Sequence, residues 1–269
     1  MSNKPTVIVI TGVSSGIGRA TAERFKSLGY QVFGTVRNAS NHQPIVGVEL
    51  VAMDVRDEDS VNRAISAIAA KTGRIDVLVN NAGVSVVGAV EETSIQEAMA
   101  LLDTNVLGIM RTVKATLPYM RAKRAGKVIN ISSVLGFLPA PYMGVYSASK
   151  HAVEGLSESL DHEVRQFGIR VTVVEPSFTR TQLGSNSPLA EAAIGDYTPE
   201  RDQAWKAVNK SIEKGPGPEG VVDAIVAAAT GPWQMRRTPR GMASLLSKLR
   251  RFMPFGPVDA SLRKSFGLR

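Results

Sequence analysis

The amino-acid sequence predicts an α/β protein with one doubly wound parallel sheet and helices on both of its faces. Two observations predict this fold: short runs rich in Val and Ile alternate with segments of helical periodicity, and a glycine-rich turn joins the first run to the first helix. Helices that connect successive strands are crossovers, which make the strands parallel and cover both faces of the sheet. The chain has 269 residues, 43% of them hydrophobic, and no internal repeat, so we expect a single domain over residues 1–269.

Six short apolar runs are the expected strands. β-branched residues dominate them, which is typical of strands that are buried on both faces. The last run closes at Pro176, which has no N–H to donate to a ladder. The expected strands occupy residues 6–10, 30–36, 48–54, 75–79, 126–133 and 169–176.

The expected helices lie mostly between these strands, and their ends carry recognisable signals. Gly29 and Gly168 follow two of them, as glycine often does at helix C-termini. Acidic residues lie at the N-terminal end of the expected helix 57–73, where the helix dipole favours them. Ser94 and Glu97 have the spacing of a capping box. We expect helices over residues 18–28, 57–73, 94–123, 146–167 and 219–230.

Two later segments depart from the alternation of strands and helices. Residues 177–219 contain several Gly, Pro and Ser residues, and we expect an irregular loop region that covers a binding site. Residues 236–269 form a basic C-terminal extension with nine Lys or Arg and one acid, which together account for the whole net charge of +8. The rest of the chain is neutral, and this distribution argues against nucleic-acid binding.

The basic extension mixes Leu, Phe and Met with its Lys and Arg residues. Such a segment can lie on an anionic membrane surface as an amphipathic helix, or it can pack over a pocket mouth or a subunit surface. We favour packing within the protein, and contact with a membrane surface is the less favoured alternative.

The composition also limits the chemistry. The chain has no cysteine, which excludes disulfides, thiolate metal sites and cysteine nucleophiles. His42, His151 and His162 show no metal-ligand grouping, so we expect no metal site. No apolar run approaches the roughly 18 residues of a membrane span, and residues 1–5 contain no apolar signal segment, so we expect a cytoplasmic location.

The turn after the first strand, "TGVSSGIG", carries Gly12, Gly16 and Gly18. Their spacing differs from the GxGxxG fingerprint of dinucleotide-binding proteins. The physical requirement is the same, because a turn without side chains lets a pyrophosphate approach the backbone at a helix N-terminus. A glycine turn without a ligand is the alternative, and the position between the first strand and the first helix favours the dinucleotide.

The end of the second strand indicates which dinucleotide. NAD sites usually place an acid there for the ribose 2′-hydroxyl, whereas this chain has Arg37 and Asn38. A guanidinium can bind a 2′-phosphate with two hydrogen bonds, so we predict NADP(H) rather than NAD(H). The alternative for Arg37 is a solvated surface residue. Asp54 and the stretch Asn80–Gly83 follow the third and fourth strands, where ligands of a doubly wound sheet bind.

These motifs, with the stretch "YSASK" at residues 146–150, resemble the main branch of the short-chain dehydrogenase/reductase family. The resemblance covers roughly Thr6 to Thr181 and includes "TGVSSGIG", "NNAG", "NVLG" and "ISSVLG" in that order. It implies a Rossmann-like dinucleotide-binding catalytic domain, with residues 177–219 covering the substrate. The family usually forms homodimers or homotetramers, here through the helices around 94–123 and 146–167.

The resemblance also implies a role for each motif residue. Tyr146 matches the general acid/base, Lys150 its activator, Ser133 the hydroxyl that polarises the carbonyl, and Asn105 the asparagine of the proton relay. The chain has Pro176-Ser177 where the family often has Pro-Gly, which puts nicotinamide contacts at Ser177 in doubt. The cofactor-binding residues implied are Gly12, Ser14, Ser15, Gly16, Ile17, Gly18, Arg37, Asn38, Asp54, Val55, Asn81, Ala82, Gly83, Tyr146, Lys150, Pro176, Thr179 and Thr181.

The chemistry of carbonyl reduction explains why Tyr146 and Lys150 are needed. A hydride must reach carbon, which a nicotinamide supplies, and a proton must reach oxygen. Free tyrosine has a pKa of about 10, and we expect the Lys150 ammonium, one helical turn away, to lower it. Without the cofactor turn, the same pair would be an ordinary pair on a solvated helix. Ser147 and Ser149 are interpreted as spacers, and Glu175 as structural.

The expected activity is NADP(H)-dependent interconversion of an alcohol and a ketone or aldehyde. The apolar segments "GFLPAPYMG" and 183–205 favour a lipophilic substrate. Two other classes are alternatives: a non-catalytic NADP(H)-sensing interaction protein on the same fold, and a peripheral membrane protein that uses its basic extension. The intact set of Tyr, Lys, Ser and Asn disfavours the sensor, which would not need it.

Overall fold

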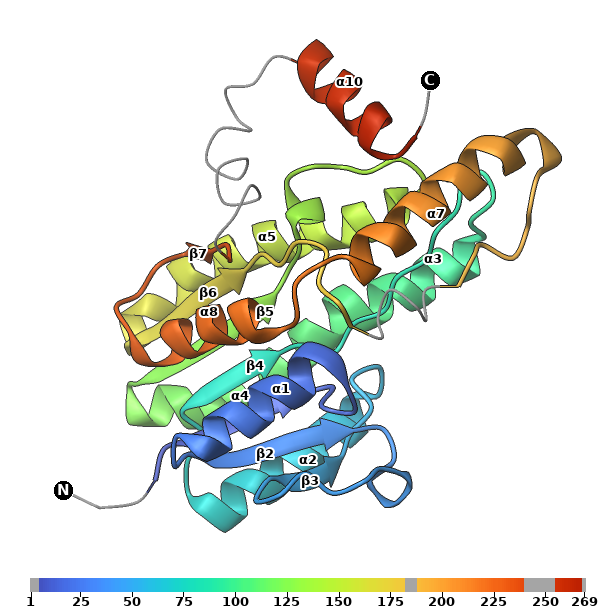
Figure 1. Cartoon of the computed structure of the whole chain (residues 1–269). Coiled ribbons are helices and arrows are strands. Elements are labelled where there is room, and N and C mark those ends of the chain that lie inside the picture. The colour runs from blue at the N-terminus through green and yellow to red at the C-terminus, as the bar shows by residue number, and fades with distance from the viewer. Residues whose placement is uncertain (1–4, 182–187, 240–254, 268–269) are drawn as a thin grey trace.

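One parallel sheet organises the chain, and its strands lie in the order β3-β2-β1-β4-β5-β6-β7 (Figure 1). The computed structural model describes residues 5–181, 188–239 and 255–267, and the following account concerns these residues. The order reverses between β1 and β4, which are neighbours in the sheet, so this point is the topological switch where doubly wound sheets bind ligands. The strands are β1 (Val7–Thr11), β2 (Gln31–Val36), β3 (Glu49–Ala52), β4 (Val77–Asn80), β5 (Gly126–Ile131), β6 (Ile169–Val174) and β7 (Arg236–Arg237).

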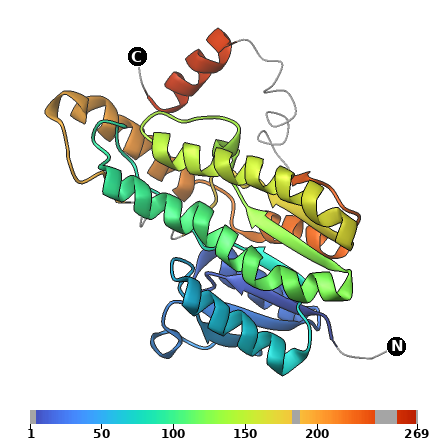
Figure 2. The same cartoon turned by 180° about the vertical axis from the view of Figure 1, so that it is seen from behind.

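Helices cover both faces of the sheet, which confirms the predicted fold class. On one face lie α1 (Gly16–Ser27) and α8 (Glu219–Thr230), in front of the sheet in Figure 1. On the other lie α2 (Glu58–Thr72), α4 (Gly108–Lys123) and α5 (Gly144–Val164), seen in Figure 2. Each face has its own core, one around Phe25 and Ile225 and the other around Ile65 and Val153.

The residues expected to cap the helices form hydrogen bonds with the first backbone N–H groups of α2 and α3. Asp57 caps α2, and its Oδ1 accepts from the N–H groups of Asp59 and Ser60. Ser94 and Glu97 form the predicted capping box at the start of α3 (Ile95–Leu102). A π-helical turn, Asp103–Leu107, joins α3 to α4, so the predicted single helix over 94–123 is continuous but widened in the middle.

Two predictions about the C-terminal third were wrong. The expected irregular region 177–219 contains a long helix, because α7 runs from Thr198 to Glu213 with a proline in its first turn. Ala204, Val208 and Ile212 give α7 an apolar face at a spacing of four. Six strands were expected, but the start of the basic extension forms β7, a seventh strand beside β6, so the extension begins inside the sheet.

The start of α1 lies at Gly16, two residues earlier than expected.

A third apolar cluster lies outside the two cores of the sheet. It joins residues of α5 and α7 to Phe266, which follows α10 (Phe255–Ser265), and α7 and α10 lie beyond one end of the sheet (Figure 1). Phe266, just after α10, is buried in this cluster together with Met143, Tyr146 and Val208. The described part of the extension therefore packs on the protein, as expected, whereas residues 240–254 and 268–269 lie outside the described residues. In the described part of the chain, no helix has the length and apolar character needed to cross a membrane.

Candidate active site

The turn between β1 and α1 is shaped to receive an anion. Gly12 and Gly16 have φ angles of 70° and 56°, in the left-handed region that favours glycine. A Cβ on Gly18 would lie 2.3 Å from the carbonyl oxygen of Gly12, so the turn and the helix approach too closely for any other residue. Ser15 caps α1 without a side-chain hydrogen bond, and no acid lies in the first turn. The N–H groups of this turn therefore suit a pyrophosphate.

The stretch after β4 holds the glycine turn in place. The Nδ2 of Asn81 donates to the carbonyl oxygens of Thr11 and Gly12, both at 2.9 Å. The Oγ1 of Thr11 accepts in return from the N–H groups of Asn81 and Ala82, at 3.0 and 2.9 Å. The predicted residues of "NNAG" are thus tied to the predicted glycine turn across the switch point between β1 and β4.

The residues predicted for the adenosine end lie at the ends of β2 and β3. Arg37 and Asn38 are exposed directly after β2. Asp54 forms an ion pair with Arg56 at 2.8 Å, and the hydrogen bond from Arg56 is the largest cause of a lowered pKa of Asp54. Arg37 also lowers this pKa through its charge. A hollow beside them is lined by Val13, Ser14, Arg19, Val36, His42, Gln43, Ile45 and Leu50.

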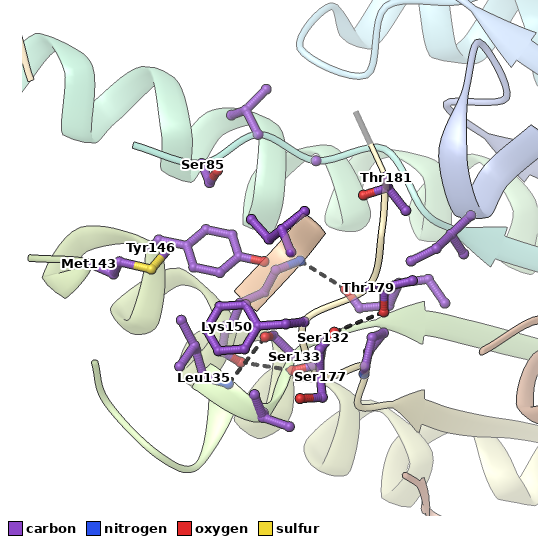
Figure 3. A pocket seen from close by; sticks show the side chains of 18 of the residues that line it. Ser85, Ser132, Ser133, Leu135, Met143, Tyr146, Lys150, Ser177, Thr179 and Thr181 are labelled. Atoms are coloured by element: carbon purple, nitrogen blue, oxygen red, sulfur yellow. Dashed lines mark hydrogen bonds between the residues drawn. The ribbon is translucent and has the colours of Figure 1, made fainter. Parts of the chain in front are cut away.

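Tyr146, Lys150 and Ser133 line a single pocket at the ends of β4, β5 and β6 (Figure 3). The Nζ of Lys150 donates to the carbonyl oxygen of Ile131 at 2.9 Å and lies 5.6 Å from the centre of the Tyr146 ring. The Oγ of Ser133 accepts from the N–H of Leu135 at 3.1 Å, which orients the serine at the end of β5. Asn81, Gly83, Pro176, Thr179 and Thr181, predicted for the cofactor, line the same pocket.

Burial is the largest cause of the shifted pKa values of Tyr146 and Lys150. It raises the pKa of Tyr146 to about 12, and the hydrogen bond with Ser133 opposes this shift. It lowers the pKa of Lys150 to about 8, and the charge of Glu154 opposes that shift. The expected lowering of the pKa of Tyr146 by Lys150 was therefore wrong for the chain alone, because removal from water costs the phenolate more than its neighbours return.

Asn105 occupies the π-helical turn between α3 and α4. Its Oδ1 accepts from the N–H of Val84 at 2.9 Å, and its Nδ2 donates to the carbonyl oxygen of Val84, also at 2.9 Å. The same Nδ2 donates to the Oγ of Ser149 at 3.1 Å. The interpretation of Ser149 as a spacer was wrong, since it links Asn105 to α5. A Cβ on Gly83 would lie 3.3 Å from the Oδ1 of Asn105 and 3.8 Å from the Nζ of Lys150, so Gly83 lets these groups approach.

The rest of the pocket wall is mostly apolar, and the motifs revealed only part of it. Ser85 lies across the pocket from Ser133, with Tyr146 between them in Figure 3. Ser177 is also part of the wall, and its carbonyl oxygen accepts from the Oγ1 of Thr179 at 2.9 Å. Val134 and Leu135 belong to the motif "ISSVLG" and Met143 to the apolar segment "GFLPAPYMG", whereas α7 brings two residues that no motif indicated. The apolar lining residues are Val84, Val134, Leu135, Met143, Phe178, Val208 and Ile212.

The fold and this pocket define a Rossmann-like protein with a dinucleotide turn and a buried Tyr/Lys/Ser centre. A family model described as short chain dehydrogenase matches residues 6–192. The chain belongs to the short-chain dehydrogenase/reductase family, and it is accordingly an oxidoreductase of alcohol or carbonyl groups.

Over most of its length, the chain is similar to named proteins of the family. The chain is 36% identical to a 3-ketodihydrosphingosine reductase from Bacteroides thetaiotaomicron, over 99% of this chain and 100% of that protein. It is 34% identical to retinol dehydrogenase 8 from Homo sapiens, over 88% of this chain and 83% of that protein.

Solved structures support the fold and the class of cofactor. A short-chain dehydrogenase from Streptomyces avermitilis superposes with a TM-score of 0.79 at 34% identity, over 94% of this chain and 97% of that chain. A family member from Burkholderia phymatum in complex with NAD has a TM-score of 0.77 at 27% identity, over 93% of each chain. Another from Burkholderia cenocepacia in complex with NADP has a TM-score of 0.77 at 25% identity, over 97% of this chain and 99% of that chain. Neighbours of this chain thus bind either dinucleotide.

Proposed function

We propose that this protein is an NADP(H)-dependent oxidoreductase that interconverts a lipophilic alcohol and its ketone or aldehyde. The observation that carries the proposal is the pocket that the buried side chains of Tyr146 and Lys150 line together with Ser133 (Figure 3). The apolar wall of the pocket supports a lipophilic substrate. The names of the two relatives, a ketodihydrosphingosine reductase and a retinol dehydrogenase, point to substrates of the same character.

Each polar residue has a distinct task in this proposal. A nicotinamide held by the glycine turn and the pocket would supply a hydride to the carbonyl carbon in reduction, or take one from the alcohol carbon in oxidation. Tyr146 donates its phenolic proton to the carbonyl oxygen during reduction and takes a proton from the hydroxyl during oxidation. Ser133 donates a hydrogen bond to the same oxygen, where negative charge develops. Lys150 and Asn105 hold the surroundings of Tyr146 in place, and a positive charge on Lys150 favours the phenolate.

An absorbance assay tests the catalytic role of Tyr146. NADPH and a panel of lipophilic ketones and aldehydes should give turnover in the parent protein. Tyr146→Phe removes the proton donor without changing the shape of the side chain, so we expect turnover to fall by at least about 10²-fold while NADPH binding remains. Substantial turnover in Tyr146→Phe would refute the acid/base role, and NADPH fluorescence provides the control for binding.

The preference for NADP(H) is proposed from Arg37. This guanidinium is exposed at the end of β2, next to the hollow beside the glycine turn, and no acid is among the residues that line this hollow. We expect Arg37→Ala to weaken NADPH binding about tenfold or more and to leave NADH binding nearly unchanged. A parent protein that binds NADH more tightly than NADPH would contradict this proposal.

Assembly into a homodimer or homotetramer is also proposed. Met110 on α4 is a large apolar residue that is 42% exposed, and Leu107 before it is 44% exposed. Such a surface is typical of helices that pair with a second copy. Sedimentation of the parent protein as a monomer at micromolar concentration would contradict the proposal. The cytoplasmic location stays a prediction from the sequence.

A further inference from the structure

A buried carboxyl group lies one helical turn beyond Lys150. Glu154 follows Lys150 by four residues on α5, so the two side chains share one face of the helix. Glu154 is only 7% exposed, and its Oε1 has no hydrogen-bond partner among the described residues. Buried charged oxygens are normally paired, so an unpaired oxygen at this position requires an explanation.

Among the described residues, the guanidinium of Arg236 contacts this carboxyl group and two others. The Oε2 of Glu154 accepts from the Nε of Arg236 on β7 at 3.2 Å. The same guanidinium pairs with Glu158 on α5 and lies 3.5 Å from the Oε1 of Glu175 at the end of β6. Thr238 also donates to Glu175. One guanidinium serves three carboxyl groups, and like charges so close together favour a proton on one of them.

The other side of Glu154 faces the turn that carries the active-site serine. A Cβ on Gly136 would lie 3.0 Å from the Oε1 of Glu154 and 2.6 Å from the Oγ of Ser132. The Oγ of Ser132 in turn contacts the carbonyl oxygen of Lys150 at 3.5 Å. Gly136 therefore leaves room for the carboxyl group beside the same part of α5 that positions Lys150.

Glu154 and Lys150 change charge in neighbouring ranges of pH. Burial raises the pKa of Glu154 to about 7, Glu175 adds to this, and Ser132 and Arg236 oppose it. Burial lowers the pKa of Lys150 to about 8, and Glu154 opposes this through its negative charge. From other elements, the described contacts near the Nζ of Lys150 are the carbonyl oxygen of Ile131 and, across Gly83, the side chain of Asn105, and both of these groups are neutral.

We infer that Glu154 is a positioning residue that controls the charge of Lys150: ionised, it stabilises the Lys150 ammonium, and protonated, it withdraws that support. Because β7 supplies Arg236, the C-terminal strand sets the charge of Glu154 and through it the charge at the active centre. For catalysis the inference rests on the proposed function, since it makes the proton transfer at Tyr146 depend on a proton held two helical turns away.

The titration of Lys150 tests the inference directly. Protein labelled with ¹³C at lysine Cε is titrated by NMR, and the Lys150 resonance is assigned by its loss in Lys150→Arg. Glu154→Gln removes the negative charge but keeps the size of the side chain, so the Lys150 midpoint should fall by about half a pH unit or more. Glu158→Gln is the matched control, because Glu158 pairs with the same Arg236 from an exposed position. It should leave the midpoint unchanged, and an unchanged midpoint in Glu154→Gln would overturn the inference.

Two further measurements keep the test decisive. Glu154→Asp retains the charge and should return the midpoint towards that of the parent protein. If Glu154→Gln does not fold, the parent titration decides: coupling produces a second inflection of the Lys150 signal as Glu154 ionises, and a single inflection overturns the inference. The titration needs no substrate. A parent protein that reduces no ketone would therefore contradict only the proposed function. A Lys150 midpoint that is the same in the parent protein and in Glu154→Gln would contradict only the inference.

Discussion

Three titratable side chains on one face of α5 lie in a place where burial disfavours their charged forms. Burial raises the pKa values of Tyr146 and Glu154 and lowers that of Lys150. Each group is separated from the next by one helical turn, and the negative charge of Glu154 acts on Lys150. The protonation of Glu154 and that of Lys150 are therefore coupled, and we expect a substitution of Glu154 to change the midpoint of Lys150.

The stability of the fold should depend on pH because of Glu154. Its pKa rises from 4.5 to about 7 on folding, so the folded chain holds a proton that the unfolded chain has released between these pH values. The free energy of unfolding should therefore fall as pH rises through this window, by at most about 3 kcal/mol. Glu154→Gln should remove this slope. Urea unfolding from pH 5 to pH 7 measures it.

Other titrations should not obscure this result. Lys150 has a lowered pKa, so it contributes a slope of the opposite sign, and only above about pH 8. Asp76 and Asp161 have lowered pKa values, so their contribution is lost only below about pH 4. An equal slope in the parent protein and in Glu154→Gln between pH 5 and pH 7 would contradict the prediction.

Helix α7 forms one wall of the pocket, and a buried ion pair holds it there. Glu92, after β4, is fully buried and pairs with Arg201 of α7. Glu92 also accepts from the N–H groups of Ala89 and Ile194, both at 2.9 Å. These contacts thus join the segment after β4 to Ile194 and Arg201, which follow more than a hundred residues later in the sequence. The ion pair positions Val208 and Ile212 of α7 along the pocket.

Breaking this pair should destabilise the protein strongly. Arg201→Met leaves the Glu92 carboxylate buried without its partner, so we expect a loss of about 3 kcal/mol in the free energy of unfolding. Lys114→Met is the matched control, because it breaks the pair between Lys114 and Glu58, in which both side chains are more than half exposed. That control should cost less than about 1 kcal/mol. Equal losses in the two variants, measured by urea unfolding, would show that α7 is held by other contacts.

The C-terminal extension belongs to two parts of the molecule. Its first residues form β7 and bring Arg236 to Glu154. Its last described residues form α10, and Val258 and Phe266 are buried, the latter in the apolar cluster that contains Tyr146. The described end of the extension thus packs beside the pocket residue Tyr146.

Deleting residues 240–269 should affect the substrate more than the cofactor. The deletion keeps β7 but removes Phe266 from the cluster beside Tyr146, so we expect the KM for a lipophilic ketone to rise by about tenfold. The dissociation constant of NADPH should stay within about twofold, because the glycine turn lies at the other end of the site. An unchanged KM would contradict the prediction. Sedimentation with anionic vesicles is a parallel measurement, and vesicle binding that depends on these residues would instead favour the membrane alternative.

Much of the fold and of the centre could be predicted because the signals are local. Alternating apolar runs and capping residues define the strands and helices that the structure contains from β1 to β6. The motif residues Tyr146, Lys150 and Ser133 line one pocket, as expected. Strand β7 has only two residues and a basic sequence, so it carries no apolar pattern and exists only through its pairing with β6. Helix α7 was obscured by the Gly, Pro and Ser residues around it.

The order of residue types along the chain was thus sufficient for the sheet, the glycine turn and the family, since each depends on neighbours within a few positions. Only the tertiary structure could assign Ser149 to Asn105, and Glu154 to Arg236. It also reversed the expected direction of the pKa of Tyr146. The physical reason is that burial and pairing depend on which distant segments meet, and the free energy of a charge is decided by that environment rather than by the residue that carries it.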